Sequence, residues 1–283
     1  MTVDVEDYFQ VLAFEPYIKR QQWEQLPQRV ERNTNRILEL FDQHGVKATF
    51  FTLGWVAERY PALVRNIVAA GHELAAHGYE HIRVIEQTPA QFRADTRKTK
   101  QILEDIGGCS VDGYRAASYS IGANNLWALK VLEEEGFLYS SSIYPVKHDI
   151  YGMPDAPRFM FTPKETTGLV EIPISTFKLL HKNLPCGGGV FFRLYPYGLS
   201  KAAYRYINTV EKQAGIFYFH PWEIDPEQPK QQGISFKTRF RHYLNLNDMV
   251  SRLTKLLQDF SWDTMRAVFL SPDKLHPVAK LIN

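Results

Sequence analysis

Two histidines at positions 77 and 81 form the part of this sequence that points most clearly to chemistry. Histidines four positions apart on one helical turn project to the same side, so the rings of His77 and His81 can bind one metal ion. In the zinc-protease pattern H-E-x-x-H, the glutamate that acts as the base directly follows the first histidine. Glu80 does not stand at that position here. The pair therefore indicates a metal site and disfavours a protease.

The acidic residues near the N-terminus are candidates for a further ligand. Asp4, Glu6 and Asp7 follow a short β-branched run, which predicts a strand that delivers acids to its carboxyl end. In a strand, Asp4 and Glu6 face the same side. One carboxylate and two imidazoles bind Zn²⁺ and similar divalent ions and leave positions open for water and substrate, which predicts hydrolysis.

Two further segments suggest the same chemistry. The segment Gly113-Tyr114-Arg115-Ala116-Ala117-Ser118-Tyr119 is a polar cluster, and Ile216-Phe217-Tyr218-Phe219 is an apolar strand that stops at His220. Taken in order, the four pieces resemble the motifs of the polysaccharide deacetylase family, which is the NodB-like carbohydrate esterase family four. The resemblance runs from residue 1 to the strand that ends at His220.

Three longer matches resemble one branch of this family, the deacetylases found with exopolysaccharide and exosortase (PEP-CTERM) gene clusters. They are D-V-E-D-Y-F from Asp4, G-G-G-V-F-F-R-L-Y-P-Y from Gly187, and F-H-P-W-E-I-D-P from Phe219. The resemblance implies a distorted (β/α)-barrel with fewer than eight regular units and an active site at the carboxyl ends of the strands.

The resemblance also assigns roles to the acids and histidines. Asp4 corresponds to the general base, the next acid binds the metal, and His77 and His81 are the metal histidines. Val5 separates acids that are adjacent in many relatives, so either Glu6 or Asp7 could be the metal carboxylate, and same-face geometry favours Glu6. A solvated strand end or a helix cap is the alternative for these acids.

Arg115 corresponds to the family arginine that pairs with the base, and His220 to the histidine that donates a proton to the leaving amine. Ala117 stands where the family has proline, which predicts a less rigid loop. Relatives orient this histidine with an aspartate, but Ser140 occupies that position. Either Ser140, Asp149 or a water molecule is expected to orient His220, or the histidine is less well oriented than in relatives.

Substrate contacts are expected from Tyr119, which would wall the cleft, from Gly188 within a run of three glycines, and from Trp222. A glycine run can bring backbone amides close to a sugar or simply form a tight turn. Aromatic side chains can stack on pyranose rings or pack in the core. The candidate platforms are Tyr8, Trp55, Tyr144, Tyr195 and Trp222.

The composition excludes several other classes of protein. A formal net charge of +2 argues against nucleic acid as a partner. The basic stretch from Lys230 to His242 is interpreted as a solvated face, with binding of an anionic glycan as the alternative.

Cys109 and Cys186 are expected to be free thiols. No apolar run reaches the ~20 residues of a membrane span, and the N-terminus lacks a signal-like segment. We expect no integral membrane segment and a cytoplasmic location, which includes the periphery of the inner membrane.

With 45% hydrophobic residues, the 283-residue chain can bury one substantial core, and we expect a single α/β domain over 1–283. A proline- and glycine-rich stretch at about 145–197 predicts an irregular excursion with short strands. Strands are expected at 47–53, 72–76, 111–116, 169–174 and 216–219. Helices are expected at 27–45, 62–70, 88–106, 124–135, 200–213 and 247–260.

The resulting hypothesis is a metal-dependent hydrolase that removes N-acetyl groups from N-acetylhexosamine residues of a polysaccharide or oligosaccharide in exopolysaccharide biosynthesis, or of the lipid-linked precursor of the exopolysaccharide. Zn²⁺ is the expected ion, and Co²⁺, Ni²⁺ or Mn²⁺ are accepted by the same ligands. One alternative is a hydrolase of a small non-peptide amide on the same fold. The other is a catalytically silent glycan-binding scaffold, which Ala117 and Ser140 would favour.

Overall fold

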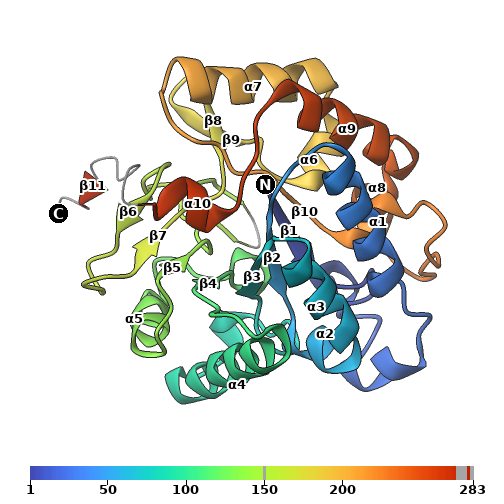
Figure 1. The fold of residues 1–283 in the computed structure, drawn as a ribbon. Coiled ribbons are helices and arrows are strands. Elements are labelled where there is room, and N and C mark those ends of the chain that lie inside the picture. The colour runs from blue at the N-terminus through green and yellow to red at the C-terminus, as the bar shows by residue number, and fades with distance from the viewer. Residues whose placement is uncertain (149–150, 272–278, 281–283) are drawn as a thin grey trace.

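The computed structural model describes residues 1–148, 151–271 and 279–280 of the chain. Its centre is a sheet whose short strands curl round one another, with helices packed outside them (Figure 1). In spatial order the strands are β10 (Tyr218–Phe219), β1 (Thr2–Val5), β2 (Thr49–Thr52), β3 (Glu73–Ala76), β4 (Gly113–Tyr114), β5 (Tyr139–Ser140), β7 (Val170–Glu171), β6 (Phe161–Thr162) and β11 (Ala279–Lys280).

Neighbouring strands from β10 to β7 run parallel, and β6 is antiparallel to β7. All residues of β1 and β2 are buried, as expected for strands covered on both faces. This open, curled sheet confirms the distorted barrel with fewer than eight regular units.

The helices follow the expected order along the chain. They are α1 (Val30–Gln43), α2 (Gly54–Arg59), α3 (Pro61–Ala69), α4 (Pro89–Gly107), α5 (Trp127–Glu134), α6 (Gly189–Leu194), α7 (Tyr197–Thr209), α8 (Phe236–Tyr243), α9 (Met249–Asp259) and α10 (Met265–Phe269). The six helices expected from the sequence are confirmed with small shifts of their ends. Four helices were not expected. Three of them, α2, α6 and α10, have only 6, 6 and 5 residues, which is too short to show a clear apolar period. The fourth, α8, lies almost entirely in the basic stretch that was interpreted as a solvated face.

The excursion at 145–197 contains β6, β7 and α6, together with a separate hairpin of β8 (Thr176–Leu179) and β9 (Lys182–Pro185). Residue 149 lies outside the described residues, so the expectation that Asp149 orients His220 cannot be placed. Cys109 and Cys186 are free thiols. Among the described residues, no helix combines the length and apolar composition that spanning a bilayer needs.

Helix α4 shows how local sequence sets the elements that frame the site. Thr88 caps its N-terminus by accepting a hydrogen bond from the backbone N–H of Gln91, and Pro89 begins the helix. Gly108 ends it in the left-handed conformation, with φ of 63°. Because α4 packs against β3, α2, α3 and α5, these two ends fix the frame beside the histidine loop.

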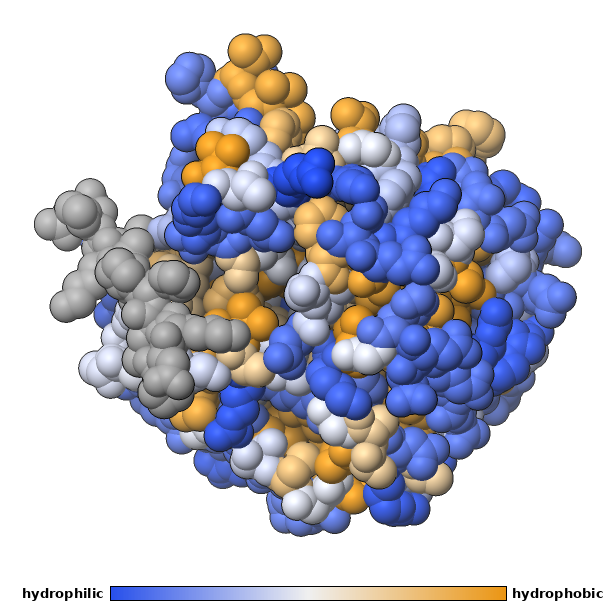
Figure 2. Space-filling model, turned by 45° about the horizontal axis from the view of Figure 1, so that its top comes forward, coloured by the Kyte–Doolittle hydropathy of each residue, from blue (hydrophilic) through white to orange (hydrophobic). Residues whose placement is uncertain are grey.

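The face shown in Figure 2 is largely hydrophilic, with hydrophobic residues emerging in small groups between charged ones. Such scattered exposure is ordinary for a folded protein. The large apolar side chains are concentrated inside. Two clusters, one with Val3 and Phe50 and one with Leu74, share one side of the sheet, and a third, with Phe51 and Ala75, lies on the other side.

One buried histidine away from the site gives a prediction about stability. His72 accepts a hydrogen bond from the backbone N–H of Ala48 at 3.2 Å through Nδ1, and it packs against Phe41 and Phe50. Burial lowers the pKa of His72 to about 4, with Lys47 adding to the effect. Since the folded pKa lies below the unfolded value of 6.5, the contribution of His72 to stability is complete above pH 6.5 and is lost as the pH falls toward 4.

We therefore expect the free energy of unfolding to drop between pH 7 and pH 5 more in the wild type than in His72→Gln, as measured by urea denaturation. His181→Gln, at an exposed hairpin position, is the control and should retain the wild-type dependence. An identical pH dependence in His72→Gln and the wild type would contradict this assignment.

Candidate active site

The carboxyl ends of the parallel strands bring the expected residues together. Glu6 follows β1, His77 follows β3, Arg115 follows β4 and His220 follows β10. These ends meet at one edge of the curled sheet, where parallel α/β folds place their chemistry. Residues as far apart in the sequence as Asp4 and His220 thus contribute side chains to one site.

His77 and His81 do not lie on a helical turn, so that part of the sequence prediction is wrong. Residues 77–81 form a loop, in which Gly78 has φ of 78° and His81 has φ of 54°. A glycine at position 78 adopts this conformation without the strain that a Cβ would cause. The loop folds back on itself, and the two rings lie 5.3 Å apart between centroids.

The start of α2 and one side chain of α4 hold this loop. The backbone N–H groups of Gly54 and Trp55 donate to the carbonyls of Gly78 and Tyr79, each at 3.0 Å. The first N–H groups of a helix have no acceptor within the helix itself. Here the carbonyls of the histidine loop accept their hydrogen bonds. The carboxylate of Asp95 accepts from the backbone N–H of Tyr79 at 3.2 Å.

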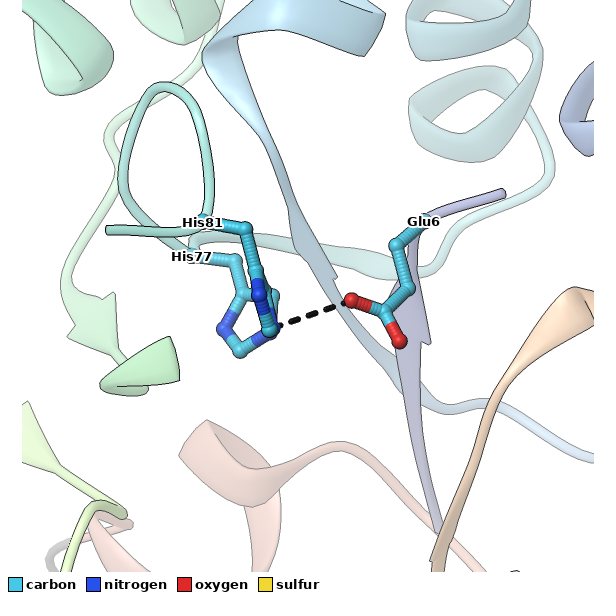
Figure 3. A group of neighbouring side chains, drawn as sticks. All are labelled: Glu6, His77 and His81. Carbon is cyan, nitrogen blue, oxygen red and sulfur yellow. Dashed lines mark ion pairs between the residues drawn. The ribbon is translucent and has the colours of Figure 1, made fainter. Parts of the chain in front are cut away.

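Glu6, His77 and His81 form a group whose candidate ligand atoms all lie within 4.8 Å of one another. Figure 3 shows the two imidazoles and the carboxylate pointing toward a common centre from the loop after β3 and from the end of β1. The carboxylate Oε2 of Glu6 lies 3.0 Å from Nε2 of His81. All three side chains are buried.

The chemistry of this group fits a divalent cation. His77 donates its Nδ1–H to the backbone carbonyl of Arg115 at 2.8 Å, which leaves the lone pair of Nε2 facing Glu6 and His81. Burial lowers the pKa of His77. Burial, and next the charge of His77, lower the pKa of His81 well below its usual range. Both rings therefore favour the neutral form, which is the form that binds metals. Among the described residues, none donates a hydrogen bond to the buried Oε2 of Glu6. A buried carboxylate facing two neutral imidazoles is compensated by a cation.

Asp7 is not part of this group, which corrects the alternative assignment of the metal carboxylate. Its Oδ2 accepts hydrogen bonds from the backbone N–H groups of Arg29 at 2.6 Å and Val30 at 2.9 Å, at the start of α1. Its Oδ1 accepts from the N–H of Tyr8 at 2.8 Å. Asp7 is a helix cap, so its position leaves Glu6 as the carboxylate that faces the histidines.

Asp4 and Arg115 form a fully buried ion pair beside the histidines. Nη1 of Arg115 donates to Oδ1 of Asp4 at 2.6 Å and to the hydroxyl of Thr2 at 2.9 Å. The other oxygen, Oδ2, faces Nε2 of His220 at 4.0 Å. Asp4 therefore keeps one oxygen directed toward the cavity while Arg115 fixes the other.

The serine segment after β5 positions Arg115. Ser141 accepts from Nε of Arg115 through its carbonyl at 3.2 Å and from Nη2 through its hydroxyl at 3.1 Å. Ser140 donates to the hydroxyl of Ser142, which in turn accepts from the backbone N–H of Ala116 at 2.9 Å. Ser140 thus supports the arginine loop, and it does not orient His220.

Glu223 orients His220, which the sequence analysis did not anticipate. Nδ1 of His220 lies 2.8 Å from Oε1 of Glu223, and the backbone N–H of His220 donates to the same oxygen at 3.1 Å. Nε of Arg193 donates to Oε2 of Glu223 at 2.8 Å, and both side chains are fully buried. Both residues lie inside the quoted motifs, and the spacing H-x-x-E, which resembles a capping box, was the available signal.

The charges around His220 favour its protonated form. Burial lowers the pKa of this ring, but the carboxylates of Glu6, Glu223 and Asp4 outweigh burial and raise it to about 9. Burial likewise raises the pKa of Glu223, but Arg193 and His220 outweigh this and lower it to about 2. His220 is therefore placed to hold a proton on Nε2, 3.4 Å from Glu6.

An aromatic stack supports the imidazole of His220 from one side. His220 lies parallel to Trp222 with centroids 5.2 Å apart, and Trp222 lies on His242 at 4.2 Å. Burial and the charge of Arg193 lower the pKa of His242 to about 3, so the base of the stack stays neutral and donates from Nε2 to Gln228.

The glycine run has a packing role. A Cβ at Gly189 would lie 2.3 Å from the carboxylate of Glu223, and one at Gly188 would lie 2.7 Å from the hydroxyl of Tyr218. Because these two positions have no Cβ, α6 can begin in contact with Glu223. Gly188 is buried and does not line the cavity, so the structure does not bring it to a substrate as expected.

The site opens into a cavity of about 680 Å³. Asp4, Glu6 and the three site histidines lie at its floor, and Tyr119 and Trp222 line it as expected. Tyr8, Trp55, Tyr144 and Tyr195 do not line it, and the first three are buried core residues. The loop with Ala117 places Ser118 and Tyr119 at positive φ beside the cavity.

Glu6→Gln and Asp7→Asn form a matched pair of variants. In Glu6→Gln the affinity for Zn²⁺, measured by titration calorimetry, should fall by more than the ~10–100-fold that losing an outer-shell partner costs. In Asp7→Asn the Zn²⁺ affinity should be retained, and the free energy of unfolding should drop by about 1 kcal/mol through the weakened cap of α1. Loss of Zn²⁺ affinity in Asp7→Asn with retention in Glu6→Gln would contradict the assignment.

Glu223→Gln tests the partner of His220. The amide can keep its oxygen toward Arg193 only by turning its NH₂ toward Nδ1 of His220, which removes the proton from that nitrogen and the charge that raises the pKa of the ring. We expect turnover to fall ~10–100-fold with unchanged metal content and a folded circular-dichroism spectrum. Glu227→Gln, at an exposed position nearby, is the control. Wild-type turnover in Glu223→Gln would refute the role.

Comparison with known proteins divides the chain into two matched segments. Residues 22–138 match the profile of the family described as polysaccharide deacetylase. Residues 141–270 match the profile of a domain of unknown function, DUF3473. His77, His81 and Arg115 lie in the first segment, and Arg193, His220 and Glu223 lie in the second.

Curated relatives match about a third of the chain. The peptidoglycan-N-acetylglucosamine deacetylase of Bacillus cereus is 36% identical over 96 residues, which cover 34% of this chain and 35% of that protein. The peptidoglycan deacetylase of Helicobacter pylori is 32% identical over 108 residues, or 38% of this chain and 36% of that protein. The chain thus spans about a third of the length of these relatives.

Solved structures extend the similarity of fold to nearly the whole chain. A Mycobacterium smegmatis protein assigned to the polysaccharide deacetylases has a TM-score of 0.60 at 20% identity, covering 95% of this chain and 87% of its own. The Puue allantoinase has a TM-score of 0.54 at 21% identity, covering 83% and 70%. Together with the matched profile, these findings confirm the resemblance seen in the motifs: residues 22–138 belong to the polysaccharide deacetylase family.

Proposed function

We propose that this protein is a metal-dependent hydrolase that removes N-acetyl groups from N-acetylhexosamine residues of a polysaccharide, in the production of an exopolysaccharide. The observation that carries the proposal is the convergence of one base, one acid and one metal-ligand group on a single cavity. His220 Nε2 lies 4.0 Å from Asp4 and 3.4 Å from Glu6, at the floor that His77 and His81 share. The relatives named as deacetylases agree with this chemistry.

Amide hydrolysis needs an activated water, stabilisation of the oxyanion and a proton for the departing amine. A divalent ion held by Glu6, His77 and His81 would supply the Lewis acidity that lowers the pKa of water and polarises a carbonyl oxygen. Zn²⁺ fits this donor set, and Co²⁺, Ni²⁺ and Mn²⁺ are alternatives.

The side chains of the protein perform the proton transfers. Oδ2 of Asp4, held in place through Arg115, accepts the proton of the attacking water. His220 donates the proton on Nε2 to the nitrogen of the leaving amine, which would otherwise depart as a strongly basic anion. Glu223 and Arg193 hold His220 in the orientation and charge state that this donation requires.

A catalytically silent scaffold was an alternative because Ala117 stands where relatives have proline and Ser140 stands where they use an aspartate. The position of Glu223 removes the argument from Ser140, since a carboxylate from another element holds His220 at 2.8 Å. The complete set of base, acid and metal ligands supports an enzyme.

The experiment is acetate release from N-acetylated chito-oligosaccharides by the wild type, His77→Ala and His220→Ala. Chelation should abolish release by the wild type, and added Zn²⁺, Co²⁺, Ni²⁺ or Mn²⁺ should restore it. His77→Ala should lose both metal and activity. His220→Ala should keep the metal and lose ~10²–10⁴-fold in turnover. His181→Ala, an exposed position, should behave as the wild type. Equal release by the wild type and His77→Ala would remove the proposed mechanism.

A further inference from the structure

The cavity continues beyond the catalytic residues into an arm with a different character. Three elements wall this arm: the 3₁₀ turn η1 (Leu12–Phe14) with the residues that follow it, α6 and α8. The apolar residues that line it are Val11, Leu12, Ala13, Pro16, Tyr17, Val190, Phe191, Leu194, Phe240 and Leu244. Tyr17, Leu194 and Phe240 are exposed by 41%, 45% and 46%, so the arm opens to solvent.

The arm offers little to a polar sugar chain. Among the described residues that line the cavity, Asp4 and Glu6 are the only carboxylates, both belong to the catalytic floor, and none is an asparagine or a glutamine. Against the apolar residues of the arm, sugar hydroxyls would lose water without gaining hydrogen bonds, which is unfavourable. The polar residues that line the arm are all on α8: Lys237, Thr238, Arg241 and His242. An apolar chain would instead be stabilised by burial against this wall.

The opposite wall suits the sugar. Ser118, Tyr119 and Tyr218 line the cavity on the side of Arg115, close to Asp4 and His220. Tyr119 is buried, and its hydroxyl has no hydrogen-bond partner within the part of the chain that the structure describes. An acetamido sugar on this side would place its amide over the catalytic floor and its anomeric substituent toward the arm.

Basic side chains stand beside the apolar arm. Lys237 and Arg241 line the cavity from α8, four positions apart and therefore on one face of the helix. A cationic pair next to an apolar trough is complementary to an anionic group that is attached to an apolar chain.

We propose that the substrate is an amphiphile: an acetamido sugar joined through a phosphate or diphosphate to a long apolar chain. The sugar lies against Tyr119 and Tyr218, the phosphate contacts Lys237 and Arg241, and the apolar chain follows Leu12, Phe191, Leu194 and Phe240 toward solvent. This inference rests on the proposed function and specifies its substrate class.

The first test is direct binding to the full-length protein by titration calorimetry, with dodecyl phosphate below its micellar concentration. It should bind at least ~10-fold more tightly than inorganic phosphate or the uncharged dodecyl maltoside, with a negative heat-capacity change from apolar burial. Leu194→Asp and Arg241→Glu should each weaken this binding by at least ~10-fold.

Two control variants match these changes outside the cavity. Leu199→Asp removes another exposed leucine, on α7, and Arg239→Glu reverses another charge on α8. Both should bind dodecyl phosphate as the wild type does. Absence of saturable binding, or equal weakening in the control and cavity variants, would overturn the inference.

An acidic glycan without an apolar chain is the competing occupant. If an alginate oligosaccharide binds, and this binding is lost in Arg241→Glu and kept in Leu194→Asp, the arm recognises an acidic polysaccharide and the amphiphile is rejected.

The second test compares acetate release from N-acetylglucosamine 1-phosphate and from its dodecyl ester. The ester should be preferred in kcat/KM by at least ~10-fold, and Leu194→Asp should remove most of this preference. Equal values for both substrates would overturn the inference. No release from either substrate or from chito-oligosaccharides, with dodecyl phosphate binding intact, would refute the proposed function while the ligand class stands.

Discussion

The buried carboxylate of Glu6, placed against two neutral imidazoles, is the constraint on which the site depends. Burial raises the pKa of this carboxyl to about 7, so the protein alone stabilises its charge poorly. A divalent cation between Glu6, His77 and His81 would compensate that charge and use the lone pairs that the histidines direct inward. The surrounding contacts, from the carbonyl of Arg115 to the start of α2, fix these donors before any ion binds.

The site is shared between segments that the comparisons treat separately. Asp4, in β1, and Glu6, just after it, precede the matched deacetylase segment, which contributes His77, His81 and Arg115. The segment of unknown function, residues 141–270, contributes His220, its partner Glu223 and the arginine that holds Glu223. Strands of both segments belong to one sheet, with β10 paired to β1. The second segment therefore supplies the proposed acid, the support beneath it and two of the walls of the apolar arm.

Much of this arrangement could be predicted from the sequence because it follows from local rules. Strand alternation places Asp4 and Glu6 on one side, and the order of strands and helices predicts an α/β fold with its site at the carboxyl ends. The role of Asp7 could not be predicted from its neighbours in the sequence. Its carboxylate accepts hydrogen bonds from the backbone N–H groups of Arg29 and Val30, 22 and 23 residues later, at the start of α1. The prediction of a helical turn at 77–81 was wrong because Gly78 and His81 adopt positive φ, which the spacing of the histidines alone does not reveal.

The partner of His220 could not be predicted for a related reason. The sequence analysis looked for a replacement at the aligned position, Ser140, but the structure supplies a carboxylate three residues after the histidine. That placement requires α6 to pass against Glu223 without a side chain at Gly189. Such compensation is a property of tertiary packing, since only the assembled helices bring Arg193, Gly189 and Glu223 together.

The most direct test of the central claim is to soak crystals of the protein with Zn²⁺ and measure anomalous scattering at the zinc edge. The account predicts one strong peak about 2.0–2.2 Å from a carboxylate oxygen of Glu6 and from Nε2 of His77 and His81. A soak at saturating Zn²⁺ that gives no peak among these three residues, or that places the ion at Asp7 instead, would contradict it.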